Sequence, residues 1–323
     1  DVVPRGVDAD ELRGVVADPG GWPASASVFL IDLQAGGSRA PDPALPFGFP
    51  GIVLGSSTDP ARRDPACDLV IGPHETGVLD AVAATVDANP VAAMTLVTLL
   101  RTGADRSVET GLLAESACYS ALQGGEEFRR WRAATTVRPI PPGDQPVIVR
   151  REGSQLRLTL NRPDRRNALD ISMRDALAEA LTLATLDDGI ERIVLDGAGP
   201  AFCSGGDLDQ FGTAPDPASA HLVRIERSLG ALLAGVSGRL TVRVHGACVG
   251  SGIEMAAFAG EVIADPDVRI GLPEVSMGLI PGAGGTVSIT RRIGRHRTCR
   301  LALSGERLDA PTALDWGLVD AEG

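Results

Sequence analysis

The sequence contains no lysine, and all 30 of its basic residues are arginines. This absence excludes Schiff-base chemistry and a nucleotide-binding P-loop, because both require a lysine ammonium group. Aromatic residues make up only 3% of the chain, so nothing indicates a dedicated aromatic cage. The four histidines and five cysteines are scattered without a CxxC pair, and we therefore expect no metal site.

Long apolar runs and a basic charge are also missing. No stretch reaches the roughly 18 unbroken apolar residues of a membrane span, and no basic-then-apolar signal begins the chain. The net charge of −12 argues against binding to nucleic acid or to an anionic membrane. The odd, unpatterned cysteines suit a reducing compartment. We therefore expect a cytoplasmic protein with neither a nucleic-acid nor a membrane partner.

A proline-rich segment, residues 138–146, predicts a linker between an N-terminal domain (1–137) and a second domain (147–323). Residues 1–27 and 35–50 are rich in Gly and Pro and predict irregular structure. Short apolar runs bounded by Gly or Pro predict buried strands, and later three- and four-residue spacing predicts helices. The predicted strands are 28–33, 51–57 and 67–72, and the predicted helices are 77–88, 91–102, 108–122 and 126–132.

Strands and helices alternate after the linker, which predicts an α/β layered fold. The predicted strands are 147–151, 156–160, 193–196 and 240–244, and the predicted helices are 171–186 and 217–235.

Two glycine-rich turns and two glutamates carry the chemistry. Gly205 and Gly206 lie in the loop 201–207, and Gly250 precedes a small-residue helix that holds Glu254 in its first turn. Glu274 lies 20 residues further along the chain. Taken singly, the glycines predict an ordinary tight turn, and each glutamate predicts a carboxylate at the positive end of a helix.

Residues 147–323 as a whole resemble the crotonase superfamily, which includes enoyl-CoA hydratases and isomerases. The resemblance rests on four blocks in the family's order, namely Asn161-Arg162-Pro163 with Asn167-Ala168-Leu169, residues 201–207, residues 246–254 and residues 273–286. It implies a spiral of ββα units, assembled as a trimer or a pair of trimers.

The resemblance also implies roles for individual residues. The N–H groups of Gly206 and Ser251 would form an oxyanion hole, although family members often have Gly at the Ser251 position. Glu254 and Glu274 would be the catalytic pair. The remaining acyl-CoA contacts implied in this way are Arg162, Arg165, Arg166, Ala168, Ser204, Gly205, Asp207 and Gly250. Coenzyme A would enter as part of the substrate, with no other cofactor and no metal.

Plainer roles are open for several of these residues. The arginines of residues 162–166 also fit a solvated basic loop, and Asp207 fits an anchor of its own turn. Cys203 and Cys248 fit small packing residues rather than nucleophiles, and His245 fits a structural role.

The function implied is enoyl-CoA hydratase: syn addition of water across a 2,3-unsaturated acyl-CoA, with Glu254 activating water and Glu274 protonating C2. An enoyl-CoA isomerase and a cofactor-independent dihydroxyphenylacetyl-CoA dioxygenase are alternatives. A non-catalytic acyl-CoA-binding subunit is the alternative from another class.

The chain departs from the family pattern at both ends. In family members a further helical segment follows the equivalent of Gly317-Leu318-Val319, whereas this sequence stops at Gly323. Residues 83–132 resemble those C-terminal helices, with an Asn-Pro start, a Glu on the middle helix and a final Glu-Glu-Phe stretch. We therefore hypothesise that residues 28–135 are a degenerate second crotonase-like unit whose helices cap the site. The alternative is an unrelated accessory domain.

Overall fold

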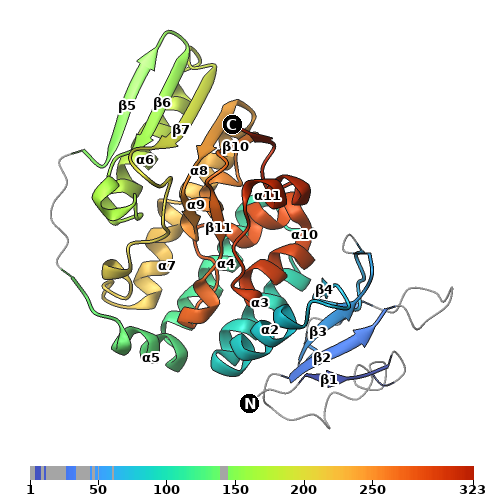
Figure 1. Cartoon of the computed structure of the whole chain (residues 1–323). Helices are drawn as coiled ribbons and strands as arrows, with labels where there is room; N and C mark the ends of the chain where they lie inside the picture. The colour runs from blue at the N-terminus through green and yellow to red at the C-terminus, as the bar shows by residue number, and fades with distance from the viewer. Residues whose placement is uncertain are drawn as a thin grey trace.

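The protein is described from a computed structural model that covers residues 4–8, 11, 27–33, 44–45, 48–49, 51–59, 62–138 and 145–323. Most of the irregular segments predicted at 1–27 and 35–50, and most of the predicted linker, lie outside these residues. Figure 1 shows a small sheet at one end of the molecule, a layer of helices next to it, and a larger sheet at the other end.

The N-terminal part is a parallel sheet followed by four helices. Its strands are paired in chain order, β1-β2-β3-β4. The described elements are β1 (Arg5–Gly6), β2 (Ser27–Asp32), β3 (Gly51–Ser56), β4 (Leu69–Ile71), α2 (Thr76–Ala88), α3 (Pro90–Arg101), α4 (Val108–Gln123) and α5 (Glu126–Ala134). The seven strands and helices predicted here are confirmed to within two residues. Local capping explains two helix starts, since Pro90 opens α3 and the Ser107 side chain accepts the Thr110 N–H at 3.2 Å before α4.

The larger part contains a six-stranded sheet in the order β12-β10-β8-β7-β6-β5, in which only the β5–β6 hairpin is antiparallel. Its strands are β5 (Val147–Glu152), β6 (Gln155–Leu160), β7 (Arg192–Gly197), β8 (Leu240–Val244), β10 (Glu261–Ala264) and β12 (Ala321–Glu322). A separate parallel pair consists of β9 (Ala247–Val249) and β11 (Arg269–Gly271). The predicted mixed α/β architecture is confirmed.

Helices cover these sheets, and short 3-10 turns join them. They are α6 (Ile171–Leu186), α7 (Pro217–Glu226), α8 (Leu229–Gly235), α9 (Ser251–Ala256), α10 (Gly285–Ser304) and α11 (Ala310–Trp316), with turns η2 (Pro163–Arg165), η3 (Leu208–Gln210), η4 (Ser237–Arg239) and η5 (Glu274–Met277). The helix predicted at 171–186 is confirmed to the residue, because the Asp170 side chain accepts the Met173 N–H at 2.8 Å and fixes its start.

The single helix predicted at 217–235 is wrong, because the chain forms two helices there. Arg227 leaves the helical conformation, with φ −118° and ψ 46°. The Ser228 side chain then accepts the Ala231 N–H and starts α8 as a new helix.

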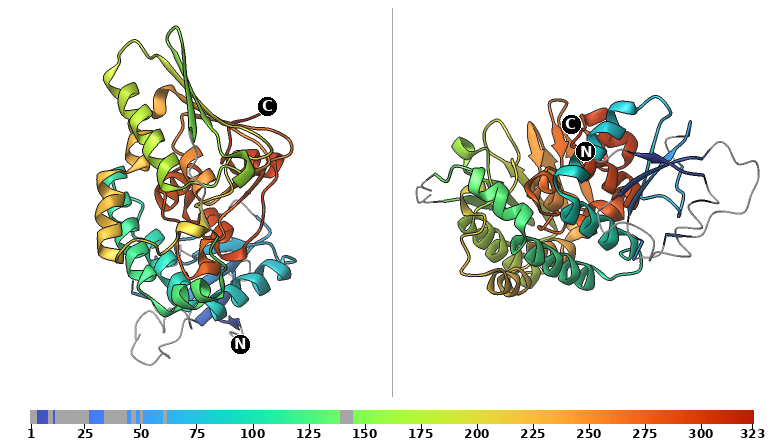
Figure 2. Two further views of the ribbon diagram at one scale, coloured as in Figure 1. Left: turned by 90° about the vertical axis from the view of Figure 1, so that its left-hand side faces the viewer. Right: turned by 90° about the horizontal axis from the view of Figure 1, so that it is seen from below.

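The two parts of the chain share one core. A single buried apolar cluster contains residues of β3, α3 and α4 together with residues of β6, α9 and α10. Polar contacts join them as well: the His296 ring bonds the Asp64 carbonyl at 2.8 Å, and Arg300 bonds both oxygens of Glu75. Both views in Figure 2 show the N-terminal helices lying against the later part of the chain.

Among the described residues, no single helix has the length and hydropathy needed to cross a membrane; α2 and α3 meet the test only jointly, as a pair bent by 112°.

Candidate active site

Three chain segments run parallel and end side by side, and this arrangement creates the site. β9 pairs with β11 on one side, and Cys248 forms a bridge with Cys203 on the other. The carboxyl ends of parallel segments meet at one edge. The chain therefore brings together the residues that follow each segment, which are Gly206, Ser251 and Glu274.

The turns at this edge leave no room for side chains. A Cβ on Gly250, which has φ +52°, would lie 2.3 Å from Oε1 of Glu274. A Cβ on Gly252 would lie 2.6 Å from the Cys203 carbonyl oxygen. On Gly206 it would lie 2.6 Å from the ring of Phe211. Glycine is thus required both for the backbone conformation and for the close approach of the two loops.

The N–H groups of Gly206 and Ser251 are available to a ligand. The β-bridge between Gly206 and Leu169 is formed by the N–H groups of Leu169 and Asp207. The Gly206 N–H is therefore not used in this bridge. Ser251 is the first residue of α9, where an N–H has no partner within its own helix. No residue of the described part accepts a hydrogen bond from either group. Gly206 and Ser251 both line one cavity, and two such backbone donors at one cavity are what an oxyanion hole needs.

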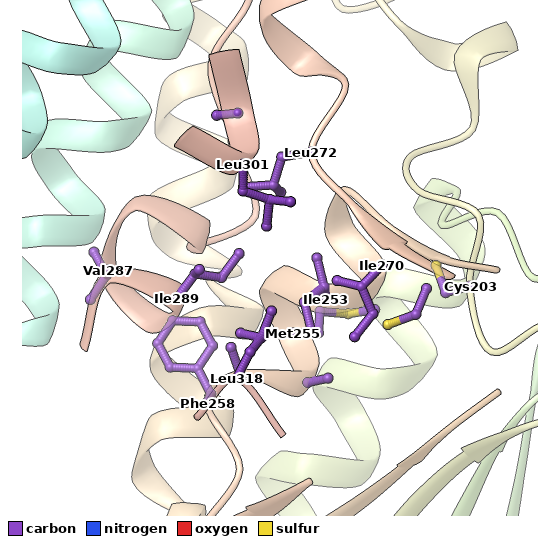
Figure 3. Close-up of a cluster of buried hydrophobic side chains, with 14 of the residues drawn as sticks. Cys203, Ile253, Met255, Phe258, Ile270, Leu272, Val287, Ile289, Leu301 and Leu318 are labelled. Carbon is purple, nitrogen blue, oxygen red and sulfur yellow. The ribbon is translucent and has the colours of Figure 1, made fainter. Parts of the chain in front are cut away.

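Glu254 is buried and anchored. Its Oε2 accepts the N–H of Ala283 at 2.7 Å and that of Gly285 at 2.9 Å. Burial raises the pKa of Glu254 to about 7, while these backbone N–H groups act in the opposite direction by stabilising the carboxylate. A carboxylate that is both oriented and titrating near neutrality suits a general base. The neighbours of Glu254 on α9 are packed into the core, since Figure 3 shows Ile253 and Met255 within a cluster of buried apolar side chains that includes Phe258 and Ile289.

Glu274 is buried without such anchors. Its Oε2 forms no hydrogen bond with any described residue. Burial raises the pKa of Glu274 well above the ordinary carboxyl value, and the Glu254 charge adds to this shift. The Arg307 charge acts in the opposite direction. Because burying a carboxylate with an unpartnered oxygen is costly, Glu274 is favoured in its neutral form, which can donate a proton. The two glutamates therefore differ in the way that acid–base chemistry requires.

A third buried carboxylate, Glu115 of α4, lies among these groups, and nothing in its sequence neighbourhood predicts a role in the site. Its Oε1 accepts the Gly284 N–H at 2.7 Å, and its Oε2 accepts the N–H and the hydroxyl of Thr286 at 2.9 and 2.6 Å. Burial, followed by the Glu254 charge, raises the pKa of Glu115 to about 8. Glu115 and Glu254 thus hold alternate N–H groups of one loop.

Helices α4 and α5 line the same region. The Tyr119 ring occupies the space beside Gly282, where a Cβ would lie 2.4 Å from Cδ2. Phe128 of α5 stacks on Trp131, and Trp131 contacts Phe211 beside Gly206. The N-terminal helices therefore help to form the site.

A cavity of about 710 Å³ connects these groups. Its lining includes both glutamates, Gly206, Ser251 and residues of α4, α6, α7 and α8. This volume is within the ordinary range for small-molecule sites, about 300–1,000 Å³.

Two of the three arginines of the loop 162–166 have carboxylate partners. The Arg162 side chain is 8% exposed and bonds Asp207 and the Ala168 carbonyl, while Arg165 bonds Asp207 and Asp209. Asp207 also accepts the Asp209 N–H, so it anchors its own turn. Arg166 is exposed and has a left-handed backbone, with φ 50°. Of the three arginines, Arg166 is thus the one whose guanidinium makes no ion pair within the described residues.

The remaining predicted residues lie around the same loop. The Ser204 N–H bonds the Arg166 carbonyl at 3.0 Å, and Gly205 accepts the Leu169 N–H at 2.8 Å. Burial raises the pKa of Cys203 to about 11, so its thiol is a poor nucleophile. His245 bonds the Gly199 carbonyl at 3.0 Å. Over the residues with described positions, no cluster of His, Cys, Asp and Glu could hold a metal ion.

A family model described as enoyl-CoA hydratase/isomerase matches residues 150–322. The chain belongs to this family. Over 173 residues it is 36% identical to the 2,3-dehydroadipyl-CoA hydratase of Escherichia coli K12, a match that covers 54% of this chain and 67% of that protein. It is also 36% identical over 178 residues to the 1,2-epoxyphenylacetyl-CoA isomerase of the same organism, covering 54% of this chain and 68% of the relative.

Solved structures agree with this membership. The crystal structure of an enoyl-CoA hydratase/isomerase from Marinobacter aquaeolei is 31% identical, with a TM-score of 0.51, covering 55% of this chain and 70% of that one. A hydratase and an isomerase match at the same 36% identity. These similarities therefore support the family and its acyl-CoA substrates, but they do not distinguish hydration from isomerisation.

Proposed function

We propose that this enzyme adds water across the double bond of a 2,3-unsaturated acyl-CoA. The observation that carries the proposal is a pair of buried glutamates in different environments beside two unpaired backbone N–H groups. Glu254 is oriented by backbone N–H groups, whereas Glu274 has an unpartnered oxygen. Hydration needs one base for the water and one acid for the α-carbon, and isomerisation can proceed with one proton-transferring group.

In the proposed reaction the thioester oxygen accepts hydrogen bonds from the N–H groups of Gly206 and Ser251. Glu254 removes a proton from a water molecule while the water oxygen bonds to C3. The C2–C3 double bond opens, and its electron pair moves into the thioester as an enolate, which the two N–H groups stabilise. Glu274 then delivers its proton to C2. Loss of one such N–H donor typically costs about 3 kcal/mol of transition-state stabilisation.

The experiment is to incubate the protein with crotonyl-CoA, to follow the loss of enone absorbance, and to identify the 3-hydroxy product by mass spectrometry. Glu254→Gln and Glu274→Gln should each reduce kcat by about 10²–10⁴-fold, because each removes a proton-transferring group. Glu261→Gln is a matched control, since Glu261 is an exposed carboxylate on β10. Unchanged activity in either active-site variant would refute the assignment.

A second measurement separates the two reactions of the family. If the enolate forms, solvent deuterium should enter the α-position of a saturated acyl-CoA, whether the enzyme is a hydratase or an isomerase. Exchange without hydration, combined with migration of a 3,4-double bond, would instead assign isomerase activity.

A further inference from the structure

One arginine in the cavity has no anionic partner. Arg224 of α7 is half-buried and lines the same cavity as the two glutamates. Its Nε donates to the Ser116 hydroxyl at 3.1 Å, its Nη1 to the Gln123 side chain at 3.4 Å, and its Nη2 to the Ser120 hydroxyl. All three acceptors are neutral, and no carboxylate of the described residues forms an ion pair with Arg224.

The other arginines of the cavity differ. Arg174 and Arg227 both pair with Asp175, at 2.8 and 3.0 Å. A guanidinium has five N–H donors, and the three bonds above use three of those of Arg224. Burial lowers the pKa of Arg224, while Tyr119 and Glu115 act in the opposite direction. The side chain is thus a desolvated cation with two donors left, and an anion that entered the cavity would compensate for its lost hydration.

The position of Arg224 indicates which part of a ligand it would meet. Its guanidinium lies 4.8 Å from the centre of the Tyr119 ring. Tyr119 in turn contacts Gly282, which adjoins the loop N–H groups held by Glu254. This chain of contacts runs from the glutamates to α4 and α7, along the lining of the one cavity that also holds Gly206 and Ser251. An acyl chain that extends from a thioester at Gly206 and Ser251 along this side of the cavity would meet Arg224.

We propose that Arg224 binds a carboxylate at the far end of the acyl group, so that the substrates are ω-carboxyacyl-CoA thioesters. This inference rests on the proposed acyl-CoA chemistry of the site. A bidentate contact between guanidinium and carboxylate would use the two remaining donors and would add selectivity against acyl groups that end in methyl.

The test compares equilibrium binding of hexanoyl-CoA, of the same thioester with a carboxylate at C6, and of CoA alone, by calorimetry. The wild-type protein should bind the carboxylate ligand about 10- to 100-fold more tightly than hexanoyl-CoA. Arg224→Gln should remove this preference and leave hexanoyl-CoA binding unchanged, and Arg224→Lys should retain part of it. Arg227→Gln, which removes an ion-paired charge at the same cavity, should keep the full preference.

The inference is overturned if the wild-type protein shows no preference, or if Arg224→Gln weakens all three ligands equally, since the residue would then act on CoA or on the fold. The wild-type comparison decides the matter even if the variant does not fold. Binding preference without hydration would count against the proposed function alone. Hydration of crotonyl-CoA without any preference would count against this inference alone.

Discussion

Glu115→Gln probes a site residue that comes from the N-terminal helices. In the wild type, Glu115 accepts two backbone N–H groups and one hydroxyl. Both oxygens of Glu115 can accept even when one is protonated, whereas the amide nitrogen of glutamine cannot, so in the variant either the Gly284 or the Thr286 N–H loses its partner. A buried donor without an acceptor costs about 1–3 kcal/mol. At pH 5, where Glu115 is protonated, the variant should therefore be less stable than the wild type by about this amount.

The difference should shrink as the pH rises. The pKa of Glu115 is raised from 4.5 to about 8 in the folded chain, so the folded state binds the proton more tightly than the unfolded state. This contribution to the free energy of unfolding is complete below pH 4.5 and is lost as the pH rises through about 8. This pKa shift contributes at most about 5 kcal/mol to the free energy of unfolding. Glutamine does not titrate, so at pH 9 the variant should equal or exceed the wild type in stability.

The assay is urea unfolding at pH 5, 7 and 9, followed by the fluorescence of Trp131 and Trp316. Glu109→Gln is the matched control, because Glu109 is an exposed carboxylate on the same helix. A stability difference that stays constant from pH 5 to pH 9 would refute the reasoning, since it would mean that Glu115 does not hold a proton in the folded state.

Two further substitutions test the packing of the site and of the N-terminal part. Gly250→Ala should reduce kcat at least about 100-fold with little change in CoA binding, because the new Cβ would lie 2.3 Å from Oε1 of Glu274. Steady-state kinetics and calorimetry with CoA would check this, and full activity would contradict it. Arg101→Met should lower the free energy of unfolding by about 3–5 kcal/mol, because the buried Asp68 loses the nearer of its two arginine partners, at 2.6 Å, and keeps only Arg295 at 3.7 Å. Urea unfolding would measure this, with exposed Arg129→Met as control, and equal stability of the two variants would contradict it.

Much of the fold follows from local sequence. Short β-branched runs produce β2, β3 and β4, and the Asp170 cap fixes the first residue of α6. The break between α7 and α8 was missed because a serine within a long apolar pattern is a weak signal. Ser228 acts as an N-cap because its side chain accepts the Ala231 N–H in the folded chain.

The site is predictable where its geometry depends on neighbours in sequence. A glycine turn followed by a helix predicts the free N–H of Ser251, and the structure has that turn. Partners distant in sequence were not predictable. Arg165 pairs with Asp209, 44 residues away, and Glu115 bonds Thr286, 171 residues away. A residue spacing carries no information about such pairs, because they depend on how the helices pack.

The loop between η5 and α10 shows why the N-terminal helices matter for chemistry. Successive N–H groups from Ala283 to Thr286 alternate between Glu254 and Glu115. Glu254 thus keeps its orientation through a loop that α4 holds from the opposite side. The Glu254 charge in turn raises the pKa of Glu115. The orientation of the proposed base therefore depends on a helix about 130 residues before it in the sequence, which makes α4 a component of the proposed active site.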